Sequence, residues 1–293
     1  DSGVLFSANS RMASADMAGR LGRDWATPTR AVRIGAMLDR DGIFTERDLH
    51  AMQLDTAMPH LRPLQERLLR ILPDDDPDES VRRARAYVAS WDGTAGEQQT
   101  GFRILMLVDR RLADEVLQVV APVVAERRFR VDSEPLRRLL QQESIDCLPD
   151  RHASFDAMYD AAFRSVVAEL VQQEADGGGL DMPWGQVNMS DFAHPFSRNT
   201  PWGSARLNLP SHPQGGHPDA VRVSHPRFGA SARLVVAPGR EERGLLQTPG
   251  GQSGHYLSPN YADQHEAWRT GAPAPLLPGE TTSVVRLQRA AGP

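Results

Sequence analysis

The chain has 293 residues, of which 40% are hydrophobic and 24% are charged, and its formal net charge is −5. These values are typical of a globular protein with a substantial core, and the acidic balance argues against a nucleic-acid partner. All 33 basic residues are arginines, interleaved with acids rather than clustered. No apolar run is long enough to cross a membrane, and the single cysteine, Cys147, excludes a disulfide framework and cysteine-based metal clusters.

The first residues do not look like an ordinary N-terminus. The sequence begins at Asp1 without a methionine, and no charged segment followed by an apolar one marks a secretion signal. Residues 1–9 (DSGVLFSAN) are typical of a turn that enters a strand at residues 4–8. These features predict that the chain is a fragment that begins within a domain.

Apolar residues recur at helical spacing from residue 28 to about residue 174. Thr27 is predicted to cap a first helix, with Pro28 in its first turn, and Thr45 to begin a second. Further helices are predicted along the apolar stripes at residues 64–72, 81–91, 102–119 and 155–170. Segment 28–175 is therefore predicted to be mainly helical.

A glycine-rich break at residues 176–179 (DGGG) separates this segment from a second one with a different composition. Segment 180–293 is rich in glycine and proline, and short strands are predicted at residues 220–224, 232–237 and 283–287. We expect short strands and ordered loops that complete a core. The break is interpreted as the boundary of an insertion within one fold rather than as a junction between domains.

Motifs near both ends of the sequence follow one another in a recognisable order. Near the start come S-G at 2–3, S-A-N-S-R at 7–11, D-W at 24–25 and T-R-A-V-R-I at 29–34. Near the end come G-A-S-A-R at 229–233, G-Q-S-G-H at 251–255, S-P-N-Y-A-D-Q at 258–264, and then Trp268. In this order they resemble the penicillin acylase family of N-terminal-nucleophile hydrolases, in the C-terminal part of its catalytic β chain.

Three positions depart from the residues that the family often has. Ser10 and Asn260 stand where the family often has Asn and His, and Thr29 stands where it often has Tyr. These positions concern packing and loops more than the reaction. The differences could therefore alter the shape of the substrate pocket, whereas the expected reaction is unaffected.

The resemblance implies an α+β fold, namely an αββα sandwich of the N-terminal-nucleophile type with a helical insertion. Residues 1–293 would form the C-terminal portion of one such domain. It also implies hydrolysis of a linear acyl amide by a serine whose own α-amine acts as the base. No residue here matches that serine, because the surroundings of Ser2 match an internal segment of the family.

The expected partners follow from the same resemblance. They are the N-terminal remainder of the same precursor (the α chain and the start of the β chain) and a small acylated amine as substrate. The substrate class stays open between β-lactam side chains, N-acyl homoserine lactones and other acylated amines. Family members are mostly exported, so a periplasmic or secreted location is expected, with neither nucleic acid nor membrane as a partner.

Asn9 is the first candidate catalytic residue. Attack on an amide carbonyl places negative charge on its oxygen, and one side-chain N–H directed there is worth about 3 kcal/mol of barrier. The resemblance implies that Asn9 is this oxyanion donor. Without the resemblance, Asn9 would be interpreted as a residue that ends a strand and caps a turn.

Arg30 is the second candidate. It resembles the family's arginine beside the nucleophile, which orients the free N-terminus and the polar end of the substrate. A positive charge there would also lower the pKa of the α-amine and make it a better base at neutral pH. The alternative is a structural arginine near a helix start, paired with Asp24, while Arg33 is predicted to be a structural ion-pair partner.

The sequence gives little support for other kinds of catalytic site. The G-Q-S-G-H segment lacks the last glycine and the following helix of a nucleophile elbow, and His265-Glu266 lacks the second histidine of a zinc motif, because Arg269 takes its place. No cofactor or metal ligand is assigned; some family members bind calcium, but no ligands can be matched here. The alternative function is a catalytically inactive, truncated fragment that at most binds acyl compounds, since no nucleophile was matched.

Overall fold

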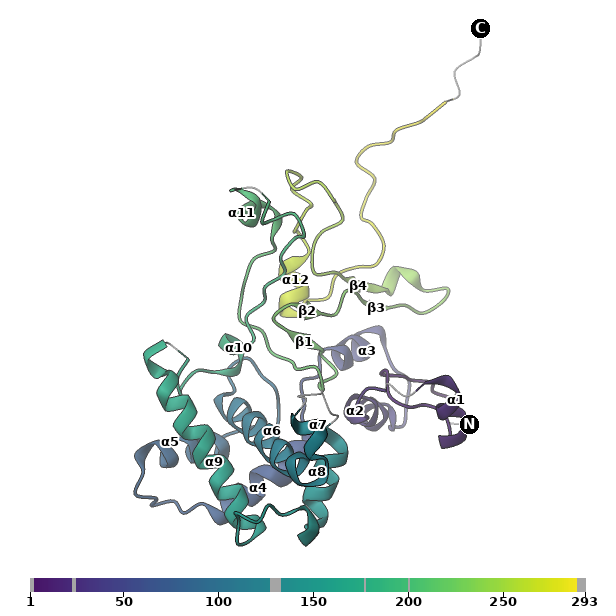
Figure 1. Cartoon of the computed structure of the whole chain (residues 1–293). Helices are drawn as coiled ribbons and strands as arrows, with labels where there is room; N and C mark the ends of the chain where they lie inside the picture. Colours follow the sequence, from purple (N-terminus) through teal and green to yellow (C-terminus); the bar gives the residue numbers. More distant parts are fainter. Residues whose placement is uncertain (1–2, 23–24, 127–132, 177, 200, 289–293) are drawn as a thin grey trace.

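The computed structural model describes residues 3–22, 25–126, 133–176, 178–199 and 201–288. Ser2, Asp24 and Gly177, which entered the sequence analysis, lie outside these ranges. Figure 1 shows a group of packed helices below and a set of loops and short strands above, with the N-terminal segment to one side.

Helices dominate the first part of the described chain. They are α1 (Ala15–Leu21), α2 (Thr29–Leu38), α3 (Glu46–Gln53), η1 (Pro59–Leu61), α4 (Arg62–Ile71), α5 (Glu79–Ala89), α6 (Thr100–Val120), α7 (Pro122–Glu126), α8 (Ser133–Gln142), η2 (Ile145–Cys147), α9 (Phe155–Gln172) and η3 (Gln173–Asp176). The apolar stripes at residues 64–72, 81–91, 102–119 and 155–170 thus correspond to α4, α5, α6 and α9.

Two of these helix starts show how local sequence selects the boundary. Thr45 and Asp48 form a capping box, because the Thr45 side chain accepts from the Asp48 backbone N–H and the Asp48 carboxylate accepts from the Thr45 N–H. The predicted cap at Thr27 is wrong. Its hydroxyl instead bonds Thr29 Oγ1 at 2.9 Å and donates to Asp219 Oδ1 at 3.0 Å, which ties the start of α2 to a distant loop.

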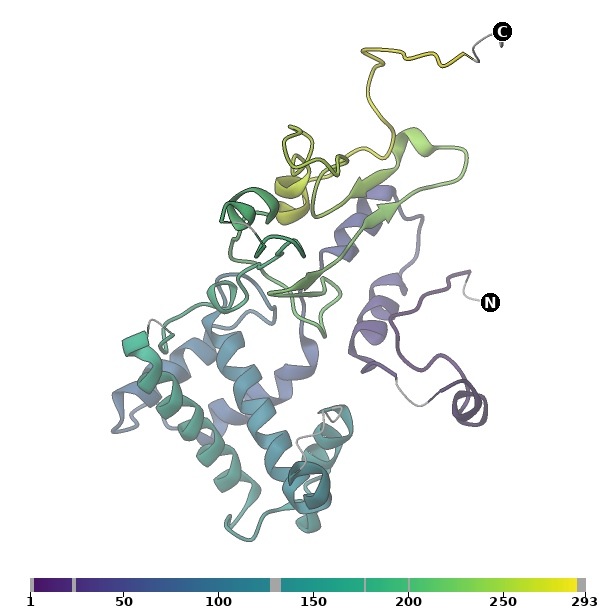
Figure 2. The ribbon, with the colours of Figure 1, turned by 45° about the horizontal axis from the view of Figure 1, so that its top comes forward.

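Helix α6 forms the centre of the core. It packs against α5, α8 and α9, and Figure 2 shows it running through the middle of the helical group. Phe102, Leu105 and Val108 are fully buried, as expected for a helix surrounded by others. Gly101 allows a close approach to α5, since a Cβ there would lie 2.1 Å from the Tyr87 carbonyl oxygen.

Short elements and loops make up the later part of the described chain. They are α10 (Trp184–Val187), α11 (Gly203–Leu207), β1 (Ser224–His225), β2 (Phe228–Gly229), β3 (Arg233–Val235), η4 (Glu241–Arg243), β4 (Leu245–Gln247) and α12 (His265–Thr270). Within the described ranges the strands form two antiparallel pairs, β1 with β2 and β3 with β4, the latter with Arg233 opposite Gln247.

Only some of the predicted strands are present in the structure. The strand at 232–237 contains β3, but the one at 220–224 overlaps β1 only at Ser224. The strands predicted at 4–8 and 283–287 are wrong for the described structure: both segments lack strand hydrogen bonding, and Leu5, Val285 and Leu287 are highly exposed. A strand needs a neighbouring strand that pairs with it in register, and no such pairing is formed by either segment in the described ranges.

The carbonyl groups at the end of α12 are bound by three side chains from elsewhere in the chain. Arg233 Nη1 donates to the Trp268 carbonyl at 2.7 Å, and Gln247 Nε2 donates to the Ala267 carbonyl at 3.0 Å. Arg222 Nη2 donates to another last-turn carbonyl at 2.6 Å. The last carbonyls of a helix have no partner within it, so these donors satisfy them and complement the negative end of the helix dipole.

The mixture of helices and small sheets is compatible with the predicted α+β class. The αββα sandwich stays a prediction for the whole protein, as does the interpretation of residues 28–175 and 180–293 as two segments of one domain. None of the helices among the described residues combines the length and apolar character that crossing a bilayer requires.

Candidate functional site

Asn9 lies at a sharp turn of the backbone that directs its side chain outward. Its φ is 63°, in the left-handed region that asparagine tolerates better than most residues. Ala8 and Ser10 on either side are buried, whereas Asn9 is exposed. The Ala26 backbone N–H donates to the Asn9 carbonyl at 3.0 Å and so ties the turn to the segment before α2.

Arg30, in the first turn of α2, contacts Asn9 directly. Its Nη2 donates to Asn9 Oδ1 at 3.0 Å, although the two residues are 21 positions apart. A guanidinium has only donors, so the amide oxygen must face Arg30 and the Nδ2 hydrogens must point elsewhere. No described residue accepts from Nδ2. The structure thus brings the two candidate residues together with an amide donor available to a ligand.

Arg33 has a different environment, one turn further along α2. Its Nε and Nη2 donate to the two carboxylate oxygens of Asp55 at 3.0 and 2.6 Å. The hydrogen bond to Asp55 raises the pKa of the Arg33 guanidinium, against the opposing effect of burial. The prediction that Arg33 is a structural ion-pair partner is confirmed, whereas the alternative pairing of Arg30 with Asp24 lies outside the described residues.

The surroundings of Asn9 are open in the described part of the chain. Phe6 packs against α2 at Gly35, so closely that a Cβ added to Gly35 would lie 3.0 Å from the Phe6 ring. Leu5 and Val32 nearby are exposed. Neither of two cavities in the described structure is lined by Asn9 or Arg30.

The two motifs near the end of the chain lie against each other. The Gly251 N–H donates to the Tyr261 carbonyl at 2.8 Å, and the Ser253 N–H donates to the Asn260 carbonyl at 3.1 Å. Gly251 is required for this contact, because a Cβ there would lie 2.0 Å from the Asn260 oxygen. Ser253 Oγ accepts the His255 N–H at 3.1 Å in a local turn, and the next helix begins only at residue 265, so this segment is no nucleophile elbow.

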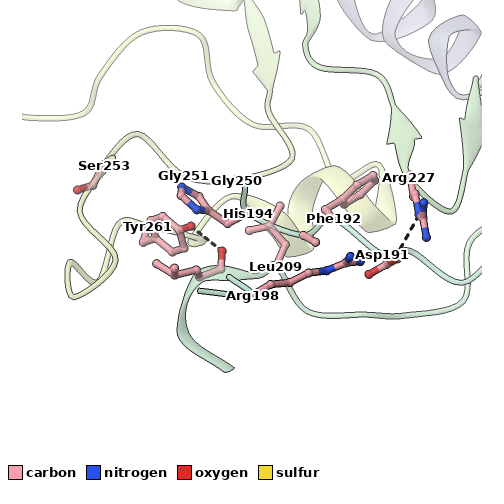
Figure 3. Close-up of a pocket in the computed structure, with 12 residues that line it drawn as sticks. Asp191, Phe192, His194, Arg198, Leu209, Arg227, Gly250, Gly251, Ser253 and Tyr261 are labelled. Carbon is pink, nitrogen blue, oxygen red and sulfur yellow. Dashed lines mark hydrogen bonds and ion pairs between the residues drawn. The ribbon is translucent and has the colours of Figure 1, made fainter. Parts of the chain in front are cut away.

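The paired motifs form one wall of a cavity of about 540 Å³. Figure 3 shows this cavity, with Gly251, His194 and Tyr261 toward one end and Phe192, Asp191 and Arg227 toward the other. No motif in the sequence predicted this cavity. The two motifs could have indicated one wall of the cavity. No spacing in the sequence indicates that they lie next to the loop that carries Arg198 and its neighbours.

The described residues do not fit a metal centre. No group of three or more His, Cys, Asp or Glu side chains lies placed to hold an ion in the described ranges. Asp76, in the acidic run after α4, pairs with Arg164 at 2.5 Å, and Asp74 pairs with Arg85. His265, the first residue of the broken zinc motif, donates from Nδ1 to the Pro249 carbonyl at 2.7 Å.

Comparisons with known proteins agree with the motifs. The family model described as "Penicillin amidase" matches residues 1–282. The chain is 29% identical over 297 aligned positions to the penicillin acylase 2 proenzyme of Pseudomonas sp. (strain SE83). The match covers 94% of this chain but only 36% of the length of that relative. Because one family model matches nearly the whole sequence, the chain belongs to the penicillin amidase family.

Proposed function

We propose that the protein is part of an amide hydrolase that cleaves a linear acyl amide into a carboxylic acid and an amine. The observation that carries the proposal is the hydrogen bond between Arg30 and Asn9, which leaves the Asn9 amide hydrogens available. Membership of the penicillin amidase family supports the reaction class. The chain spans about a third of the relative it matches, so the nucleophile is proposed to come from the rest of a longer precursor.

The proposed reaction proceeds in two steps. An N-terminal serine attacks the carbonyl carbon, its α-amine takes the hydroxyl proton and passes it to the leaving amine, and an acyl-serine ester forms. Water then attacks the ester, which releases the acid and restores the serine. In each step the carbonyl oxygen gains negative charge, and Asn9 Nδ2 donates a hydrogen bond to it.

Arg30 has two proposed roles in this arrangement. Its hydrogen bond to Oδ1 fixes which way the Asn9 amide faces, so that the donor does not have to rotate during the reaction. Its charge, placed near the free α-amine of the nucleophile, would lower the pKa of that amine and increase the fraction of free base. Arg30 is therefore a positioning residue that acts through Asn9 and through the nucleophile.

The substrate is proposed to be a small acylated amine, such as a β-lactam with an acyl side chain, an N-acyl homoserine lactone or a similar amide. The proposed partner is the N-terminal remainder of the precursor. By the family resemblance we place the mature enzyme in the periplasm or outside the cell, which fractionation of the producing cells would test.

The experiment is an assay of the complete precursor and of this chain alone on a panel of acyl p-nitroanilides of different chain lengths. The precursor should process itself and release p-nitroaniline, whereas this chain alone should not, since no residue in it matches the nucleophile. A processed precursor that hydrolyses no acyl amide would contradict the proposal and favour the inactive-fragment alternative.

A further inference from the structure

We propose that the cavity beside α11 binds an organic carboxylate with an apolar body, at a site separate from Asn9 and Arg30. Its volume of about 540 Å³ is within the range of small-molecule sites. Both views of the molecule place α11 on a different side from the N-terminal segment that carries Asn9. The inference does not depend on the proposed amide hydrolysis.

The cavity is built from segments that backbone and side-chain hydrogen bonds hold in place. The Leu209 N–H donates to the Phe192 carbonyl at 3.3 Å, and the His194 N–H donates to Asn208 Oδ1 at 2.9 Å. On the opposite wall, the Tyr261 hydroxyl donates to the Leu207 carbonyl at 2.6 Å. A site fixed in this way needs little reorganisation when a ligand binds.

The lining combines an apolar surface with an excess of positive charge. Phe192, Leu207, Leu209 and Tyr261 supply the apolar surface. Phe192 is itself fixed by an edge contact to Trp268, with ring centroids 5.5 Å apart. This composition suits a ligand with a hydrocarbon or aromatic body.

Three ionisable lining residues set the charge. Arg227 and Asp191 pair at 3.6 Å at the rim, where both are exposed, and so largely cancel each other. Arg198 has no carboxylate within ion-pair distance in the described ranges, and in Figure 3 its side chain extends along the cavity toward that pair. The cavity therefore holds one uncompensated positive charge on a chain whose net charge is −5.

His194 adds a second donor. Its Nδ1 accepts the Phe196 backbone N–H at 3.2 Å, so a neutral ring must carry its proton on Nε2. Figure 3 places the His194 ring at the Tyr261 end of the cavity and the Arg198 guanidinium at the Asp191 end, so the guanidinium alone matches the carboxylate, which accepts at both oxygens, and His194 offers a donor to a polar atom elsewhere on the ligand. A phosphate dianion would bring a second negative charge that nothing in the lining balances.

The test is calorimetric titration of this chain with hexanoate, with hexanamide and inorganic phosphate as comparison ligands. Hexanoate should bind saturably at one site, at least about tenfold more tightly than hexanamide, because the amide keeps the shape but loses the charge. Hexanamide or phosphate binding as tightly as hexanoate would overturn the proposal.

Two arginine variants locate the site. Arg198→Met should weaken hexanoate binding about tenfold, whereas Arg206→Met, at an exposed arginine of α11 outside the cavity lining, should leave it unchanged. Arg198 is exposed on a loop, so its substitution should preserve folding, which a thermal unfolding curve checks. Equal hexanoate affinities of the two variants would show that hexanoate does not bind in this cavity. Loss of hexanoate binding in the complete precursor would show that the cavity is not a ligand site of the whole protein.

Discussion

A single side-chain contact, from Arg30 to Asn9, distinguishes the candidate site from the many other polar surface positions. The amide of a free surface asparagine rotates, and only half of its orientations present a donor to a given point. Here the guanidinium selects one orientation, and the left-handed backbone of Asn9 projects the side chain away from its buried neighbours. Preorganisation of this kind is what gives an oxyanion donor its catalytic value.

Asn9→Ala in the complete precursor should lower kcat for acyl p-nitroanilides by about a hundredfold or more, because the oxyanion loses a fixed donor. KM should change little, since the ground-state carbonyl carries less charge than the oxyanion. The side chain is exposed, so the free energy of unfolding should fall only by the cost of alanine in the left-handed region, about 1 kcal/mol, and the protein should stay folded.

The matched control is Asn199→Ala, which removes another exposed asparagine side chain far along the sequence and should leave kcat unaltered. Turnover of the Asn9 variant close to that of this control would remove Asn9 from the mechanism. An equal loss in the rate of self-processing and in kcat would show that the residue acts in folding of the precursor instead.

Sequence reasoning found Asn9 and Arg30 separately, through the motifs that contain them. It did not predict their contact, because that contact depends on the φ of Asn9 and on the Ala26 to Asn9 backbone bond, which no spacing rule encodes. Arg33 was easier. A charged side chain is rarely buried without a partner of opposite charge, and the partly buried Arg33 has this partner in Asp55.

At the scale of elements, apolar periodicity predicted the helices far better than the strands. A helix satisfies its backbone within itself, so the stripe that marks α6 is a sufficient signal. A strand depends on a neighbour that can be anywhere in the chain. Residues 283–287 have the β-branched composition of a strand but no partner in the described part of the molecule.

Helix α12 shows why a short element forms without a strong sequence signal. It has six residues, too few to be stable alone, and its last carbonyls are bound by Arg233, Gln247 and Arg222. Arg233 also lies over the Trp268 ring, 5.0 Å from its centroid. The G-A-S-A-R motif thus contributes to the fold through its arginine, because it anchors the end of α12 to β3.

Arg233→Met should lower the free energy of unfolding by about 3 kcal/mol, because the Trp268 carbonyl and Gln247 Oε1 would both lose a buried donor. Methionine keeps much of the side-chain volume, so the effect should reflect the hydrogen bonds rather than a cavity. Urea unfolding at pH 7 measures it. Arg243→Met, at an exposed arginine of η4, is the control, and a loss no larger than in that control would contradict the assignment.

At the scale of the whole molecule, the helical group is joined to the loop after residue 216 by a cluster of ionisable groups around His60. The groups that face His60 are Arg137, Asp109, Asp219 and His217. Its Nε2 atom is buried with no hydrogen-bond partner in the described structure. A cluster of this kind does not indicate an αββα sandwich. A sandwich is defined by long strands, and the strands in the described chain are short and paired two by two.

Burial, reinforced by the positive charge of Arg137, lowers the pKa of His60 from the usual 6.5 to about 4. Between these two values the unfolded chain binds a proton at this site and the folded chain does not, so stability must fall as the pH drops. The loss should begin near pH 6.5, reach about 3 kcal/mol near pH 4 and then stop growing. Burial also lowers the pKa of His217, which acts in the same direction.

Urea unfolding between pH 4 and pH 7 measures this dependence. His60→Phe should make the slope shallower and leave the part that His217 contributes, whereas His255→Phe, at an exposed histidine, should reproduce the original slope. A slope that persists unchanged in the His60 variant would assign the acid sensitivity to other groups, and His217→Phe would then be the variant to measure. A shallower slope would show that the contact between the helices and the later loops limits the acid stability of the molecule.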